Sequence, residues 1–220
     1  MKLTGLQLAA LAASAILAIA YGAFGSALYE STPPYVIGAL GKASGIVVLA
    51  LIALLARSRL LAAGLLFGAL GDALLAWSEA TFLYGAFAFL IGHLFYITLF
   101  LRAGLGLAAF NQPPRLLGAI TLIIACVVMT ALLVPRDNPM FAPLAVYTGV
   151  LTLMALISFT LPAARWPAML GAVLFFISDG FVAWNMFHPD PDPTLAYWRS
   201  FAGWMVYWAG QAGLCIGALG

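Results

Sequence analysis

Hydrophobic residues run through this chain in eight long stretches, separated by short polar breaks. A helix that crosses the hydrocarbon layer of a membrane needs about 20 apolar residues, and each stretch is close to that length. The clearest breaks contain Pro33-Pro34, Arg57 to Arg59, Asn111 to Pro114, Pro135 to Pro139 and His188 to Pro193. The pattern therefore predicts eight transmembrane helices, at about Thr4–Leu28, Tyr35–Ala56, Leu60–Trp77, Thr81–Leu101, Leu116–Val134, Phe141–Leu161, Pro167–Phe187 and Arg199–Leu219.

Composition agrees with an integral membrane protein that has little soluble mass. Hydrophobic residues make up 65% of the 220 residues and charged residues 7%, whereas a soluble domain carries roughly 25% charged residues. No break is long enough for a separate domain, so we expect one transmembrane domain over residues 1–220, an all-α single bundle of eight transmembrane helices. The first apolar run exceeds the roughly 7–15 residues of a signal peptide core, so we expect it to remain as a helix.

The chain offers little that would bind a nucleic acid, a metal or a disulfide partner. Its net charge of +2 is spread too thinly for a nucleic-acid surface. Cys126 and Cys215 lie inside apolar stretches and are interpreted as small buried side chains rather than a disulfide. With His93 and His188 as the two histidines and no metal-binding motif, we expect no metal site.

Basic residues fall mainly on one side of the predicted helices. That side holds Lys2, Arg57, Arg59, Arg102, Arg115 and Arg165. The other side holds Glu30, Glu79, Arg136, Asp137, Asp190, Asp192 and Arg199. Because basic residues concentrate in cytoplasmic loops, the asymmetry predicts that both termini are cytoplasmic.

Two aspartates lie deep inside apolar stretches, and each begins the same pattern, Asp-x-x-x-Ala-Trp. These are Asp72 and Asp179, each about 12 residues, or roughly 18 Å, from the predicted cytoplasmic start of its helix. A charged residue near the middle of a bilayer costs about 2.5–3.5 kcal/mol, so such residues indicate a functional site. One interpretation is structural, with Lys42 as the partner of the aspartates. The other is a pair of carboxyl groups with separate roles, one a general acid and one a base.

Other polar residues fall at a similar depth and predict one polar cavity. His93 shares a helical face with Tyr96, and Tyr207 shares one with Gln211. Tyr147 and Lys42 lie in helices six and two, where Lys42 either neutralises the aspartates or reaches a lipid phosphate. For His93, a hydrogen bond to a backbone carbonyl is the simpler alternative. The glycines Gly64, Gly68, Gly71, Gly85, Gly92, Gly171 and Gly180 indicate close helix packing.

The ordered set of motifs resembles the YhhN family over nearly the whole chain. It comprises Gly71-Asp72-x-Leu74-Leu75, Gly92-His93-x-x-Tyr96, Gly171-Ala172 with Phe175, Ser178-Asp179, and Tyr207-x-x-x-Gln211. Lys42 matches a family lysine, although Ala43 stands where the family pattern has proline. The animal members of the family are lysoplasmalogenases, so the resemblance implies hydrolysis of the vinyl ether bond of a lysoplasmalogen.

From these residues together with the resemblance, we expect Asp72, Asp179 and His93 as catalytic residues and Lys42, Tyr96, Tyr147, Ser178, Tyr207 and Gln211 as substrate-binding residues. We also expect a lysophospholipid substrate within bilayer lipids, no cofactor, and a place in the bacterial inner membrane. Protonation of carbon followed by attack of water on an oxocarbenium ion suits two carboxyl groups, as in glycoside hydrolysis. No motif specifies the head group, the chain length or the oligomeric state.

Three other functions are compatible with some of these residues. A proton-coupled transporter also uses aspartate and histidine within the membrane, and the repeated Asp-x-x-x-Ala-Trp pattern favours it through a duplicated four-helix unit. An intramembrane aspartyl protease uses two aspartates, but this chain reads Ala69-Leu70-Gly71-Asp72 where such proteases have Gly-x-Gly-Asp. A lipid-binding protein without catalysis is the third alternative.

Overall fold

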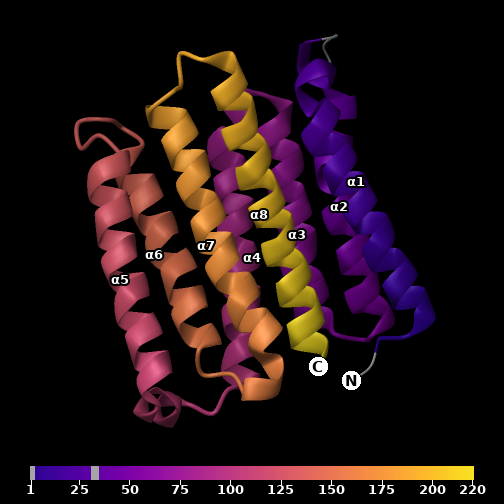
Figure 1. The fold of residues 1–220 in the computed structure, drawn as a ribbon, viewed down its shortest axis with the longest axis vertical. Coiled ribbons are helices and arrows are strands. Elements are labelled where there is room, and N and C mark those ends of the chain that lie inside the picture. The colour runs from indigo at the N-terminus through magenta and orange to yellow at the C-terminus, as the bar shows by residue number, and fades with distance from the viewer. Residues whose placement is uncertain (1–2, 31–34) are drawn as a thin grey trace.

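The computed structural model describes residues 3–30 and 35–220, and these residues form eight long α-helices with three short 3₁₀ turns (Figure 1). Lys2 and the Pro33-Pro34 break lie outside the described residues. The helices are α1 (Gly5–Glu30), α2 (Val36–Leu55), α3 (Arg59–Trp77), α4 (Phe82–Ala103), α5 (Pro113–Leu133), α6 (Phe141–Ser158), α7 (Trp166–Phe187) and α8 (Pro193–Leu219). The 3₁₀ turns are η1 (Glu79–Thr81), η2 (Leu107–Asn111) and η3 (Ala163–Arg165).

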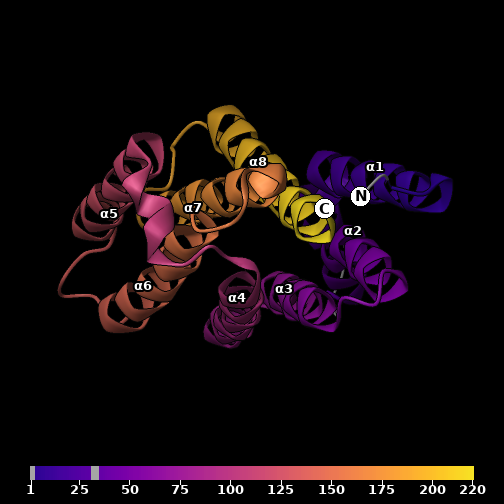
Figure 2. The same ribbon diagram turned by 90° about the horizontal axis from the view of Figure 1, so that it is seen from below.

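The eight helices run side by side in one bundle with the two ends of the chain at the same end (Figure 1). Helices α1 to α4 follow one another around one part of the bundle, and α7 lies between the α5–α6 pair and α8 (Figure 2). Helix α8 also contacts α1, α2 and α3, and α4 contacts α6. These contacts bring α3 and α7, which carry the two aspartates, to opposite walls of the same interior.

The prediction of an all-helical membrane protein is confirmed in its coarse form. Of the described helices, α1 to α7 are long and apolar enough to cross a membrane. Helix α8 is long enough at 27 residues, but Trp, Tyr, Gly and Gln replace many aliphatic residues along it. The outward faces are rich in large hydrophobic side chains, such as Ile37 and Leu132 at 67% and 71% exposure, which suits lipid surroundings.

Small residues allow α7 and α8 to approach closely. A Cβ atom added at Gly171 would lie 2.5 Å from the backbone oxygen of Gly210, and one at Gly217 would lie 2.0 Å from the backbone nitrogen of Ala168. On α4, a Cβ at Gly92 would lie 3.1 Å from the backbone oxygen of Gly64 on α3. These contacts agree with the interpretation of the glycines as helix-packing residues.

The predicted start of α8 was wrong by about two turns. The helix begins at Pro193 rather than at Arg199, because the Asp192 side chain accepts a hydrogen bond from the Thr194 backbone nitrogen at 2.8 Å. Asp-Pro is therefore a helix start here, with aspartate as the N-cap and proline in the first turn. Similarly, α5 begins at Pro113, three residues before the predicted Leu116.

Candidate functional site

A cavity of about 800 Å³ lies within the bundle, in the half that is farther from the chain termini. Every one of the eight helices contributes to its lining, so its shape depends on the whole fold. Its volume falls in the range of about 300–1,000 Å³ that is typical of ligand sites. Towards the termini the interior is closed by packed side chains, and Leu61, Leu65, Tyr96 and Phe100 there are at most 1% exposed.

Asp72 and Asp179 both line this cavity, one from α3 and one from α7. Asp72 is 2% exposed, whereas Asp179 is half-buried. Each carboxylate accepts a hydrogen bond from a tyrosine on another helix. Among the described residues neither aspartate takes part in an ion pair, since the Arg199–Asp190 pair is the one present there.

Asp72 is the end of a chain of hydrogen bonds that crosses three helices. Tyr96 of α4 donates to Oε1 of Gln211 at 2.7 Å, and Nε2 of Gln211 donates to the hydroxyl of Tyr207 at 3.1 Å. Tyr207 of α8 then donates to Oδ2 of Asp72 at 2.7 Å. Every donor in this chain points towards the carboxylate. Because aligned hydrogen bonds strengthen one another, the arrangement favours negative charge on Asp72.

Glycines of α3 make room for this chain. A Cβ at Gly64 would lie 2.5 Å from Cε1 of Tyr96, and a Cβ at Gly68 would lie 2.7 Å from Nε2 of Gln211. At Gly71 the same atom would lie 2.7 Å from the ring of Phe89. Sequence analysis assigned these glycines to packing alone, but Gly64 and Gly68 admit Tyr96 and Gln211, which carry the hydrogen bonds that reach Asp72.

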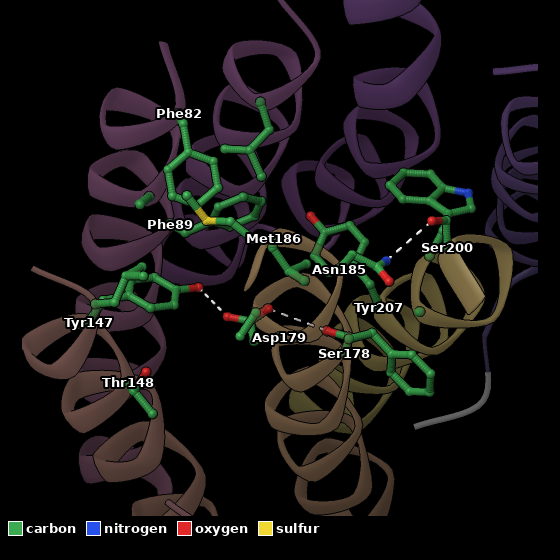
Figure 3. A pocket seen from close by; sticks show the side chains of 18 of the residues that line it. Phe82, Phe89, Tyr147, Thr148, Ser178, Asp179, Asn185, Met186, Ser200 and Tyr207 are labelled. Carbon is green, nitrogen blue, oxygen red and sulfur yellow. Dashed lines mark hydrogen bonds between the residues drawn. The ribbon is translucent and has the colours of Figure 1, made fainter. Parts of the chain in front are cut away.

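Asp179 has its own partners on α4, α6 and α7. Tyr147 of α6 donates to Oδ2 of Asp179 at 2.5 Å, as Figure 3 shows. Nε2 of His93, on α4, lies 3.3 Å from the Tyr147 hydroxyl. Because Tyr147 gives its one hydroxyl hydrogen to Asp179, His93 donates from Nε2. The Nδ1 atom of His93 is then an acceptor, and it has no hydrogen-bond partner among the described residues.

His93 does not reach the cavity itself. It is 1% exposed and packs edge-on against Phe175, with ring centroids 4.8 Å apart. Its connection to Asp179 therefore runs through Tyr147. The structure thus brings His93 to the site as a supporting residue behind Tyr147 rather than as part of the cavity wall.

Ser178 lies beside Asp179 with its hydroxyl directed mainly elsewhere. Its Oγ donates to the backbone oxygen of Phe175 at 2.6 Å and is 3.5 Å from Oδ1 of Asp179 (Figure 3). Oδ1 of Asp179 therefore has no strong donor from the described residues. This oxygen is the position at which a proton on Asp179 would be carried.

Lys42 lines the cavity from α2, and its ammonium lies over the ring of Trp204 at 5.8 Å from the centroid. It interacts electrostatically with Asp72 but forms no ion pair with it. Trp204 and Trp208 are bonded to another helix of the bundle. Their indole nitrogens donate to the Ala18 backbone oxygen at 2.8 Å and to the Ser14 hydroxyl at 2.9 Å, which ties α8 to α1.

Sequence analysis missed several polar residues that line the cavity. Asn185 of α7 and Ser200 of α8 both line it and are hydrogen-bonded at 3.2 Å (Figure 3). Asn185 follows Ser178 by seven residues, two turns along the same helical face, and this spacing was the signal that could have identified it. Glu79 and Thr148 also line the cavity.

The sequence profile of the YhhN family matches residues 37–218 of the chain. The chain belongs to the YhhN family. The matched range runs from the first turn of α2 nearly to the end of α8, so it contains every residue of the site described above except Ala18 and Ser14 of α1. The family indicated by the sequence motifs is thereby confirmed.

Two curated relatives carry the name lysoplasmalogenase TMEM86B. The protein of Mus musculus is 35% identical over 164 residues, which cover 73% of this chain and 63% of that protein. The protein of Rattus norvegicus is also 35% identical over 164 residues, covering 73% of this chain and 61% of that protein. The chain thus spans less than two thirds of the length of these relatives. No solved structure gave a significant match to the chain.

Within the described residues, no group of three His, Cys, Asp or Glu side chains is arranged to hold a metal ion. The expectation that the protein uses no metal or cofactor stays a prediction. Cys126 and Cys215 are free, on α5 and α8 respectively.

Proposed function

We propose that this protein is a membrane hydrolase that cleaves the vinyl ether bond of lysoplasmalogens, releasing a fatty aldehyde and a glycerophospho-alcohol. The observation that carries the proposal is the pair of tyrosine-bonded aspartates on opposite walls of one cavity. Membership of the YhhN family and the similarity to two proteins named lysoplasmalogenase support the substrate.

The reaction begins with transfer of a proton to the outer carbon of the vinyl ether. The electron pair of the carbon–carbon double bond forms the new C–H bond, and the inner carbon and oxygen become an oxocarbenium ion. Water then adds to that carbon and loses a proton, which gives a hemiacetal. The hemiacetal separates into aldehyde and alcohol, so that one water is used and no proton is consumed overall. A general acid and a carboxylate suffice for these steps, as in glycoside hydrolysis.

We assign the acid to Asp179 and the carboxylate to Asp72. The aligned donors from Tyr96 to Tyr207 favour negative charge on Asp72, which suits stabilisation of the oxocarbenium ion and acceptance of the proton from water. Asp179 is more exposed to the cavity, and its Oδ1 has no strong donor. That oxygen is free to hold a proton and present it to the substrate carbon.

Tyr147 and His93 serve as positioning residues for the acid. Tyr147 fixes one oxygen of Asp179, and His93 fixes Tyr147 by donating from Nε2. Ser178 makes only a weak contact, at 3.5 Å, with the other oxygen of Asp179. Tyr207 and Gln211 position Asp72, and Tyr96 is the member of that hydrogen-bond chain farthest from Asp72.

We propose that all eight helices cross the membrane and that both termini are cytoplasmic, in a bacterial inner membrane. Helix α8 lies alongside α7 along much of its length, which supports its inclusion despite its aromatic and polar residues (Figure 1). The arginines of the α2–α3, α4–α5 and α6–α7 connections would then follow the positive-inside rule. In this orientation the cavity lies nearer the outer leaflet.

The experiment is aldehyde release from a lysoplasmalogen by the purified protein in detergent. Asp72→Asn and Asp179→Asn should each lower kcat by at least about 100-fold, because each removes one of the two groups that the reaction needs. Asp137→Asn, an exposed position in the α5–α6 connection, is the matched control and should retain activity. Full activity in both cavity variants would refute the mechanism, and no aldehyde from the wild type would refute the function.

A proton-coupled transporter is less well supported. Its path would have to continue from the aspartates to the end of the bundle where the termini lie. Tyr96, Phe100 and Leu65 fill that route and are at most 1% exposed. Substrate-dependent proton uptake by the protein in liposomes, without aldehyde release, would support the transporter instead.

A further inference from the structure

Lys42 is the one lysine or arginine among the described residues that line the cavity. Its ammonium group carries three donors, yet it forms no hydrogen bond or ion pair with a described residue. A cation in an interior of low dielectric is unfavourable without an acceptor. The site thus provides a positive charge that a bound anion would neutralise.

Aromatic side chains hold this ammonium in place. The Trp204 ring lies beneath it at 5.8 Å, a cation–π distance. Trp204 is itself fixed, since its indole nitrogen donates to the Ala18 backbone oxygen at 2.8 Å and its ring packs edge-on against Tyr21 at 5.0 Å. The direction of the lysine side chain is therefore set before a ligand arrives, which lowers the entropy lost on binding.

The nearby arginine is already engaged. Arg199 donates from Nε to Oδ1 of Asn185, pairs with Asp190 at 3.5 Å, and contacts the backbone oxygen of His188 at 3.3 Å. These contacts hold the α7–α8 connection together. Arg199 is therefore occupied within the protein, whereas Lys42 remains available to a ligand.

Lys42 of α2 and the polar residues of α8 line one part of the cavity. Towards α5 the lining combines polar residues such as Thr148 with apolar ones, and α5, α6 and α7 contribute the apolar side chains of Met129, Leu144, Val182 and Met186. Helices α1, α2 and α8 are separated from α5 by α7 in both views of the bundle (Figures 1 and 2). A lipid with one chain would therefore place the chain towards α5 and its polar part towards Lys42.

We propose that Lys42, held over Trp204, binds the phosphodiester of a lysophospholipid and makes the enzyme select phosphate-bearing vinyl ethers over neutral 1-alkenylglycerols. The inference rests on the proposed function and adds a phosphate subsite to it. In such a lipid the phosphate is separated from the vinyl ether oxygen by the three carbons of glycerol. Lys42 and Asp72 both line this one cavity, which suits this short separation.

The first test compares two substrates with the same chain, an alkenylglycerophosphoethanolamine and the matching 1-alkenylglycerol. Lys42→Met should lower kcat/KM for the phospholipid by about 10- to 100-fold, mainly through KM, because a charge-assisted hydrogen bond is lost. The loss for the neutral substrate should be less than about threefold. Lys42→Arg should recover part of the phospholipid activity, and Arg102→Met, at the exposed end of α4, is the matched control with no expected effect. Equal losses on both substrates would show that Lys42 only neutralises Asp72 and would overturn the phosphate subsite.

A second test uses only the wild-type protein, so its result does not depend on whether a variant folds. Saturated ether lipids lack the double bond that is protonated, so they bind without being cleaved. An alkylglycerophosphocholine should inhibit at least tenfold more strongly than the alkylglycerol of equal chain length at the same mole fraction in micelles. Equal inhibition or equal binding would overturn the proposal. Tighter binding of the phosphate lipid to a protein that releases no aldehyde would refute the hydrolase function and leave the phosphate subsite standing.

Discussion

Tyr207 of α8 donates its hydroxyl hydrogen to Asp72 of α3 at 2.7 Å, across 135 residues of sequence. The tyrosine oxygen in turn accepts a hydrogen bond from Gln211, so its hydrogen is directed to the carboxylate. Gln211 is fixed by Tyr96. One carboxyl group of the pair is thus oriented by side chains from α4 and α8, and its geometry depends on how these helices pack against α3.

Replacing Tyr207 with phenylalanine tests this link directly. The change removes the donor to Asp72 and leaves Nε2 of Gln211 buried without its acceptor. A hydrogen bond to a charged group contributes about 1.5–3 kcal/mol, so kcat/KM for aldehyde release should fall about 10- to 100-fold. Thermal unfolding should also shift to a lower temperature, by the few degrees that correspond to an unsatisfied buried amide.

The matched control is Tyr197→Phe on the same helix. The hydroxyl of Tyr197 lies 3.4 Å from the Ala23 backbone oxygen and does not line the cavity. Activity should therefore stay within about twofold of the wild type. A Tyr207→Phe protein as active as this control would show that the hydrogen bond to Asp72 is not needed for turnover.

His93 and Tyr147 should act as one unit on Asp179. Tyr147→Phe removes the donor to Asp179, and His93→Phe keeps most of the ring volume while removing the donor to Tyr147. We expect Tyr147→Phe to lower kcat at least tenfold and His93→Phe to lower it less. The double variant should be no worse than Tyr147→Phe alone, because the histidine acts through the tyrosine.

A double-mutant cycle on kcat measures this coupling. Tyr84→Phe provides the control, since Tyr84 is on the same helix as His93 but is 68% exposed. If the losses in kcat from His93→Phe and Tyr147→Phe were additive, His93 would not act through Tyr147 and would have a separate role.

The sequence predicted the helices better than it predicted the partners of the polar residues. Apolar runs and positive charges identify the spans, and the positions of Asp72 and Asp179 along their helices follow from counting residues. The partners do not follow in this way. That Tyr147 meets Asp179 while Tyr207 meets Asp72 depends on the order in which α4, α6, α7 and α8 pack, and this order is set by close contacts between helices.

Trp204 and Arg199 show the same limit of sequence reasoning. Tryptophan near a helix end suggests an interfacial anchor, but the Trp204 indole is bonded to α1 within the bundle. The sequence likewise does not indicate that Arg199 is held by Asn185 and Asp190. The partner of Trp204 follows only from the position of α1, which is distant in sequence. The partners of Arg199 follow only from the positions of α7 and of the α7–α8 connection.

Replacing Gly68 with alanine should lower activity as well as stability. A methyl group there would lie 2.7 Å from Nε2 of Gln211 and would displace the amide that orients Tyr207. We expect Gly68→Ala to lower kcat about tenfold or more and to lower the unfolding temperature. Gly149→Ala on α6 is the control, because its Cβ meets nothing within 4 Å. That change should leave activity intact and stabilise the helix slightly.

Chain-length preference should depend on the apolar side of the cavity. Ala183 of α7 is half-buried and lines the cavity, so a leucine there would occupy space that the chain of a long substrate needs. Each methylene excluded from an apolar site loses about 0.8 kcal/mol, which is roughly fourfold in affinity. For Ala183→Leu we therefore expect kcat/KM to fall for 16-carbon substrates and to change little for 10-carbon substrates. The measurement is aldehyde release over a series of chain lengths, with Ala142→Leu at an exposed position of α6 as the control. A parallel decrease at all lengths would show that Ala183 borders the reacting group rather than the chain.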